Sequence, residues 1–137
     1  MSIHLFQEDV SVSIIKENFL STWLSKTIES ESKSLGEINI IFCSDEYLLK
    51  LNQEHLDHDY FTDILSFDYA EGDIISGDLF ISWDRVQDNA STVKVSDYDE
   101  LCRVCVHGVL HLCGYKDKLE IDKILMTQKE DFYLNLR

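Results

Sequence analysis

The fold of this 137-residue chain is decided by the stretch Leu101-Cys-Arg-Val-Cys-Val-His107-Gly-Val-Leu-His111-Leu-Cys-Gly114-Tyr115-Lys-Asp117. Read at helical period, its apolar residues fall on almost every side, which is typical of a helix buried in the middle of a domain. Gly114 provides a stop, because a glycine just past a helix end readily adopts the left-handed conformation. The stretch therefore predicts a central buried helix from about residue 97 to residue 113, followed by a tight turn.

Two histidines interrupt this apolar helix. His107 and His111 are four residues apart, so both imidazoles lie on one helix face within reach of one metal ion. Beyond the turn, Asp117 can return as a third ligand. Two histidines and one carboxylate leave one coordination position open, and an open position distinguishes catalytic zinc from structural zinc. The spacing predicts a metal site at His107, His111 and Asp117.

The alternative is that the two histidines are unrelated, one of them lying in the core with a satisfied hydrogen bond. Three features favour the metal site over that alternative. An unpaired imidazole in so apolar a helix would be costly to bury, and a helix stop and a carboxylate follow at short range. Gly108 costs about 1 kcal/mol relative to alanine within a helix, so it predicts close packing or ligand access. Gly108 also stands where a zincin peptidase carries its glutamate base, which argues against a peptidase of that type.

Composition limits the functional classes. Apolar residues make up 45% of the chain and aromatic residues 11%, which is typical of a globular protein. The formal charge of −14 argues against a broad basic surface for nucleic acid, although a local electropositive cleft around a metal ion is compatible with it. No signal peptide and no membrane span are predicted, so we expect a cytoplasmic protein whose four cysteines are thiols.

Strands and further helices are predicted on both sides of the central helix. Four strands are predicted at residues 2–7, 38–43, 64–69 and 77–82, and further helices at 14–32, from 44, at 84–94 and at 119–136. Ser13 is the predicted cap of the first helix and Gly36 its break. The order β α β α β β α α α favours a single α+β domain spanning residues 1–137, with a small mixed four-stranded sheet packed by about five helices.

Two helices show a clear apolar repeat. In the first, Ile15, Phe19, Trp23 or Leu24, and Ile28 share one face. In the last, the repeat runs through Ile121, Ile124 or Leu125, Gln128 and Phe132, all apolar except Gln128. The acidic residues of the last helix are interpreted as a solvated face: Glu120, Asp122, Glu130 and Asp131.

Other chemistry-bearing groups admit two interpretations. Cys102 and Cys105 have the spacing of a metal or redox pair, but as i, i+3 neighbours on a helix they are better interpreted as small buried residues. The group Asp57-His58-Asp59 is either a second metal cluster or a solvated loop beside the cleft. Thr62 and Asp63 are equally compatible with substrate binding and with turn capping.

His107-Gly-Val-Leu-His111-Leu-Cys-Gly114-Tyr115 resembles the signature of the YbeY family of single-strand endoribonucleases and rRNA maturation factors. A second block agrees with that family in matching order: Leu51-Asn52, Thr62-Asp63-Ile64-Leu65-Ser66-Phe67 and Gly77-Asp78-Leu79-Phe80-Ile81. The resemblance extends over roughly residues 36–135, and two blocks in register are more specific than either alone. It implies a metal-dependent ribonuclease with zinc held by three residues.

The chain departs from the family pattern at three places. Lys116 and Asp117 stand where the family usually has aspartate and a histidine ligand, and aspartate remains a competent ligand for zinc. Its negative charge weakens the acidification of water by the ion and favours Mn²⁺ or Ni²⁺ as alternatives. Leu56 replaces an arginine implicated in catalysis, and Asp68 replaces a proline. We expect Arg103, one turn before His107, or His58 to take the catalytic place of that arginine.

Three functions remain open from the sequence. The first is a metal-dependent endoribonuclease that acts on single-stranded RNA during rRNA maturation, with the ribosomal small subunit or its assembly proteins as partners. The second is an assembly factor that keeps the fold and the metal without turnover, which Leu56 and the charge of −14 favour. The third is a metal-dependent hydrolase for another substrate.

Overall fold

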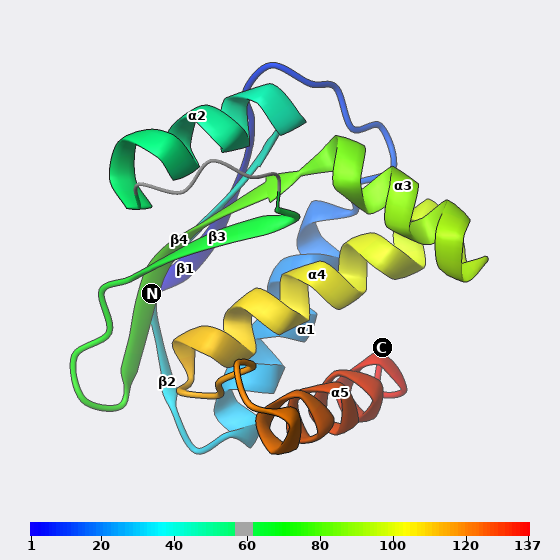
Figure 1. The fold of residues 1–137 in the computed structure, drawn as a ribbon. Coiled ribbons are helices and arrows are strands. Elements are labelled where there is room, and N and C mark those ends of the chain that lie inside the picture. Colours follow the sequence, from blue (N-terminus) through cyan, green and yellow to red (C-terminus); the bar gives the residue numbers. More distant parts are fainter. Residues whose placement is uncertain (57–61) are drawn as a thin grey trace.

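Four strands form one mixed sheet in the order β1-β2-β4-β3 (Figure 1). The computed structural model describes residues 1–56 and 62–137. Strand β2 pairs in parallel with both β1 and β4, whereas β3 pairs antiparallel with β4. The strands are β1 (Ser2–Gln7), β2 (Ser34–Cys43), β3 (Ile64–Asp68) and β4 (Ile74–Ser82). The predicted mixed four-stranded sheet is confirmed.

Helices cover both faces of this sheet. On one face α1 (Glu17–Ser30) and α4 (Asp97–Leu112) enclose the main core, and α2 (Asp45–Leu56) lies on the other face over a smaller cluster around Leu48 and Leu65. Helix α3 (Trp83–Val93) leads into α4, and α5 (Glu120–Leu134) packs against α4 away from the sheet. Within the described ranges, no helix is long and apolar enough to cross a membrane.

Helix α4 is the buried centre that the sequence predicts. Ten of its residues are buried, and they surround the helix. A Cβ added to Gly108 would lie 2.7 Å from Ile64 Cδ1 and 2.9 Å from Leu79 Cδ1, so the helix approaches β3 and β4 more closely than a side chain allows. Close packing therefore explains the glycine in the middle of this helix. The same packing fixes the distance between the sheet and His107, the residue that precedes Gly108.

Helix α1 begins later than the sequence predicts. It starts at Glu17 with Lys16 as its N-cap, and no side chain caps it, so the predicted start at residue 14 with Ser13 as cap is wrong. The preceding segment is held by Val12, which is 3% exposed and whose N–H donates to Gln7 Oε1 at 2.6 Å. Burial of Val12 therefore competes with helix formation in this segment and overrides its helical pattern.

Gly36 is not the break after α1, because it lies inside β2. The helix ends instead at Ser30 with Glu31 as its C-cap, and the chain turns at Ser32, which has φ of 60°. A Cβ on Gly36 would lie 2.1 Å from Ser76 Oγ, at the place where the register of β2 and β4 shifts between Leu35 and Ile38. This glycine therefore permits a close approach between two strands.

The apolar repeat of α5 points to solvent. Ile121 is 74% exposed, Ile124 57% and Phe132 54%, whereas Met126, Glu130 and Tyr133 are the buried residues of the helix. Trp23 Nε1 on α1 donates a hydrogen bond to the Tyr133 carbonyl at 2.9 Å, which sets the rotation of α5 against the core. The interpretation of Glu130 as part of a solvated face is therefore wrong.

We predict that Gly77→Ala lowers the free energy of unfolding by about 2 kcal/mol, because overpacked sites in a closed core cost this much. The new Cβ would lie 2.5 Å from the Phe67 carbonyl oxygen and 2.9 Å from Leu112 Cδ2. Urea denaturation measures the loss. The control is Ser66→Ala on the exposed side of β3, expected to change stability by less than about 0.5 kcal/mol. Equal stability of the two variants would contradict the prediction.

Candidate metal centre

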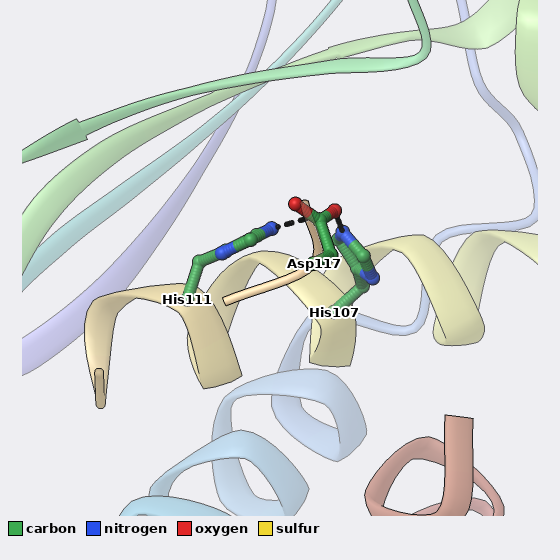
Figure 2. Close-up of side chains that lie close together, drawn as sticks. All are labelled: His107, His111 and Asp117. Atoms are coloured by element: carbon green, nitrogen blue, oxygen red, sulfur yellow. Dashed lines mark hydrogen bonds and ion pairs between the residues drawn. The ribbon is translucent and has the colours of Figure 1, made fainter. Parts of the chain in front are cut away.

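The three residues selected from the sequence converge at the end of α4 (Figure 2). His107 Nε2 and His111 Nε2 lie 3.2 Å and 3.1 Å from the same atom, Asp117 Oδ2. The two rings lie edge to face, with their centroids 4.6 Å apart. Within residues 1–56 and 62–137 no other group of three histidine, cysteine or acidic side chains is close enough to hold an ion.

Asp117 reaches the histidines because the chain reverses directly after α4. Gly114 has φ of 111°, a conformation that a residue with a side chain rarely adopts. The Tyr115 N–H donates to the Leu110 carbonyl at 3.1 Å, and the Gly114 N–H to that of His111 at 3.0 Å. The predicted helix stop at Gly114 is confirmed, and it turns the following segment back over the helix face that carries the histidines.

The second nitrogen of each imidazole is held by an acceptor. His107 Nδ1 donates to Glu130 Oε2 at 2.6 Å, and His111 Nδ1 donates to the Tyr115 carbonyl at 2.9 Å. In a neutral ring with its proton on Nδ1, Nε2 carries a lone pair. Both lone pairs then face a carboxylate oxygen, which is also an acceptor, and this arrangement calls for a cation between them.

The arrangement fits a divalent ion. The ligand atoms of the three side chains all lie within 4.8 Å of one another. Ligands at roughly 2.0–2.1 Å from a tetrahedral zinc ion are about 3.3 Å apart, close to the separations of Asp117 Oδ2 from the two imidazoles. His107, His111 and Asp117 would therefore hold the ion through three atoms, and a fourth position would stay open for a reacting group.

Glu130 is a member of the site that the sequence did not reveal. It is 6% exposed, comes from α5, and binds His107 with one carboxylate oxygen and Arg103 Nη1 with the other, the latter at 2.7 Å. Burial lowers the pKa of His107, but the hydrogen bond and charge of Glu130 outweigh burial and leave this pKa raised. His107 and Glu130 lie on different helices, so helical periodicity does not relate them. Their contact depends on the rotation of α5 against α4.

Arg103 lies one turn before His107, as expected. Its Nη1 contacts Glu130 and its Nη2 contacts Asp131 Oδ1 at 2.6 Å, so the guanidinium lies beside the metal centre and is held by α5. His58 belongs to the group Asp57-His58-Asp59, which lies outside the described residues. Helix α2 ends at Leu56.

Asp63 lies next to β3. Burial raises the pKa of Asp63, and the nearby charge of His107 opposes that rise.

Cys102 and Cys105 are fully buried in the core, which confirms their interpretation as small buried residues. The pKa of Cys113 is raised to about 11, mainly by burial. This thiol therefore stays protonated at neutral pH, and a protonated thiol is a poor metal ligand.

Beside His107 is a hollow of about 280 Å³, lined by His107, Asp117, Lys123, Met126, Thr127 and Glu130. Lys123 contributes a positive charge at its edge. The hollow would give a reacting group room beside an ion held by His107 and Asp117.

Glu31, at the C-cap of α1, supports the turn that holds His111. Tyr115 Oη donates to its carboxylate at 2.5 Å, Tyr133 Oη also donates to it, and Lys129 Nζ lies 3.3 Å away. Burial alone would raise the pKa of Glu31, but these three donors outweigh burial and lower it below 4.5. A carboxylate with a depressed pKa stabilises the fold above its unfolded pKa, and the stabilisation is lost as the pH falls through the folded pKa.

We therefore expect Glu31→Gln to lower the free energy of unfolding at pH 7 by about 1–3 kcal/mol, because charged hydrogen bonds to two tyrosines are weakened. The difference from the unsubstituted protein should shrink as the pH is lowered below about 4.5. Urea denaturation from pH 7 to pH 3.5 measures both effects. Glu29→Gln, on the exposed side of α1, is the control. A difference that grows on acidification would show that Glu31 does not act as described.

Comparisons with known proteins agree over the length of the chain. A family model described as Endoribonuclease YbeY matches residues 3–136. The chain is 52% identical to an Endoribonuclease YbeY of Flavobacterium psychrophilum over 131 residues, which are 96% of this chain and 94% of that protein. It is 44% identical to the one of Bacteroides thetaiotaomicron over 137 residues, the full length of both.

A solved structure gives the same result for the fold. The solution structure of TM1509 from Thermotoga maritima superposes with a TM-score of 0.71 and 28% sequence identity, and the match covers 97% of this chain and 87% of that one. Sequence and fold thus lead to one conclusion. The chain belongs to the YbeY endoribonuclease family.

Proposed function

We propose that this protein is a metal-dependent endoribonuclease that hydrolyses single-stranded RNA during rRNA processing in the cytoplasm. The observation that carries the proposal is the convergence of His107, His111 and Asp117 on one point, with room beside it for a substrate. Its activity would contribute to maturation of the small-subunit rRNA end and to ribosome quality control. Its partners would be rRNA and the ribosomal small subunit or its assembly proteins.

The proposed cofactor is one Zn²⁺ per chain, held by His107, His111 and Asp117. When bound, the ion supplies Lewis-acid polarisation of a phosphate oxygen and activation of water for hydrolysis. Replacement of a neutral ligand by Asp117 lowers the net charge of the centre and favours harder ions, so Mn²⁺ or Ni²⁺ are alternatives. Glu130 holds the proton of His107 at Nδ1, which keeps Nε2 available as a ligand.

Arg103 is the proposed catalytic residue of the described chain, and His58 is a second one. The Arg103 guanidinium carries five N–H donors. Nη1 donates to Glu130 and Nη2 donates to Asp131, so each terminal nitrogen keeps a second N–H. The remaining donors would bind non-bridging phosphate oxygens and stabilise the charge that develops on phosphorus during hydrolysis.

The uneven distribution of charge favours RNA binding at this end of the molecule. Residues 116–137 contain five basic and five acidic side chains, so the excess of acidic residues lies entirely in residues 1–115. Three of those basic residues, Lys116, Lys118 and Lys123, flank Asp117 or line the hollow beside it. A phosphate backbone that enters here therefore meets a locally neutral surface rather than the charge of −14.

The test measures bound metal and cleavage of a labelled single-stranded RNA, with Asp117→Ala and Asp117→His compared under the same conditions. We expect Asp117→Ala to remove most of the bound metal and to lower cleavage by at least about tenfold, because the two histidines that remain are too few for a stable zinc site. Asp117→His restores a neutral ligand and should retain metal, with a higher share of zinc. A preparation that binds metal and leaves RNA intact would refute the enzymatic proposal. Unchanged metal content in Asp117→Ala would exclude Asp117 as a ligand.

A protein that binds metal but leaves RNA intact would favour the alternative, a ribosome-assembly factor that keeps the fold and the metal without turnover. Leu56, in the place of the family arginine, is the residue that favours it. A metal-dependent hydrolase for another substrate is the remaining alternative, and it predicts metal binding with turnover of small phosphate esters rather than RNA.

A further inference from the structure

A groove of about 840 Å³ runs between α3, α4 and α5, beside the metal centre. Its residues include Arg103, which shares Glu130 with His107, and Thr127, which also lines the hollow beside the histidines. The groove and the metal centre are therefore neighbours along α4. Its volume lies in the range of 300–1,000 Å³ that is typical of small-molecule and cofactor sites.

At the α4 wall of the groove lies Glu100, two helical turns before His107. Its side chain is 8% exposed, and no described residue donates a hydrogen bond to its carboxylate. Burial raises the pKa of Glu100, and Arg103 opposes that rise by charge alone. A largely buried carboxylate that has no donor among the described residues favours a ligand that brings one, because buried polar groups are hydrogen-bonded in most structures.

The other charged groups of the groove are paired with one another. Arg103 Nη2 lies 2.6 Å from Asp131 Oδ1, and Arg137 Nη1 lies 3.0 Å from Asp99 Oδ1. Among the described groups that line the groove, Glu100 is thus the carboxylate without an ion pair, and a ligand that binds it must bring N–H donors. Three acidic side chains against two arginines also give the groove an excess of negative charge, which favours a neutral ring within it.

Among the four RNA bases, guanine fits this requirement best. Two adjacent donors, N1–H and the N2 amino group, lie on its Watson–Crick edge and match both oxygens of one carboxylate. Uracil presents one donor between two acceptors, and adenine and cytosine present an acceptor beside their amino group. The apolar side chains of Val93, Val95 and Leu134 offer contact to the faces of the ring.

We propose that this groove is a guanine-binding subsite, in which Glu100 recognises the base of a nucleotide close to the scissile phosphate. The inference rests on the proposed ribonuclease function, since it is RNA that brings the base to the groove. Glu100 would thereby select guanine-containing sites among single-stranded RNAs.

The experiment titrates the metal-loaded, full-length protein with guanosine, adenosine, cytidine and uridine, followed by isothermal titration calorimetry and by amide shifts in NMR spectra. Nucleosides are used because they carry no phosphate that could bind the ion. We expect guanosine to bind about tenfold more tightly than the other three, and Glu100→Gln to abolish this preference, because the amide replaces one acceptor with a donor.

Asp99→Asn is the matched control, a carboxylate-to-amide change in the same groove at a residue that pairs with Arg137. It should keep the preference for guanosine. A second variant, Thr92→Trp, fills the groove from the exposed side of α3 and should weaken guanosine binding even if Glu100→Gln fails to fold. Bound metal, measured by mass spectrometry, should be the same in all these proteins.

Equal binding of the four nucleosides, or a preference that survives in Glu100→Gln, would overturn the subsite. Cleavage of single-stranded RNA by the unsubstituted protein separates this failure from failure of the proposed function. If RNA is cleaved with no base preference, the ribonuclease function stands and the subsite does not. If guanosine binds selectively and RNA is not cleaved, the function fails and the groove is a guanine site without the proposed role in cleavage.

Discussion

Replacement of His111 by alanine is expected to remove nearly all bound metal and to lower RNA cleavage by roughly a thousandfold or more. His111 supplies one of three ligand atoms, and its Nε2 lies 3.1 Å from Asp117 Oδ2. With the imidazole gone, His107 and Asp117 remain, and two ligands are too few for a stable zinc site. Metal analysis of protein purified without chelator or added metal gives the first result, and cleavage of a labelled single-stranded RNA the second.

His4→Ala is the matched control for this variant. His4 is an exposed histidine on β1, and its Nε2 is hydrogen-bonded to Ser2 Oγ at 2.8 Å. Bound metal and RNA cleavage should be unchanged in it. Because His111 is also linked to the Tyr115 carbonyl, circular dichroism is needed to show that the His111→Ala protein is folded. Full metal content in a folded His111→Ala protein would refute the assignment of this centre.

The second large effect is expected from Glu130→Gln, with a metal affinity lower by about tenfold to a hundredfold. The carboxylate of Glu130 accepts the proton of His107 Nδ1 at 2.6 Å, and it also binds Arg103 Nη1. An amide in the same place donates as well as accepts, so the tautomer of His107 is no longer enforced and its nitrogen becomes a weaker ligand. Competition with a fluorescent zinc chelator measures the affinity.

Asp131→Asn separates this effect from the loss of a charge near Arg103. Asp131 is the next residue of α5 and binds Arg103 Nη2, whereas the acidic partners of the two histidines within the described residues are Glu130 and Asp117. We expect its metal affinity to stay within about threefold of the unsubstituted protein, because exposed ion pairs contribute little. If Asp131→Asn and Glu130→Gln lose affinity equally, the effect arises from Arg103 and not from the orientation of His107.

The central helix shows why part of the site was predictable from local sequence. His107 and His111 share a face through the i, i+4 periodicity of the helix, and Gly114 ends it through its own backbone freedom, so both features depend on a few neighbouring residues. Asp117 follows within one short turn, and the structure places its Oδ2 beside both imidazoles. Short-range geometry constrains this much of the centre.

Helix α5 shows where local sequence was insufficient. Its apolar repeat, Ile121, Ile124 and Phe132, predicts a buried face, yet these residues are exposed and Glu130 is buried. The rotation of the helix is decided by contacts from other elements: Trp23 Nε1 with the Tyr133 carbonyl, Glu31 with Tyr133, and Arg103 and His107 with Glu130. Satisfied buried polar groups outweigh the exposure of several apolar side chains here.

By itself, therefore, the sequence determined the order of the elements, the buried central helix, and the pair of histidines with the carboxylate after the turn. Tertiary structure alone decided that Glu130 orients His107, that Glu31 supports the turn of Tyr115, and that Glu100 lies at the wall of a groove beside the metal centre. The first set depends on helical periodicity and on one glycine. The second depends on how α1 and α5 pack on α4, which brings together residues that the sequence holds more than twenty positions apart.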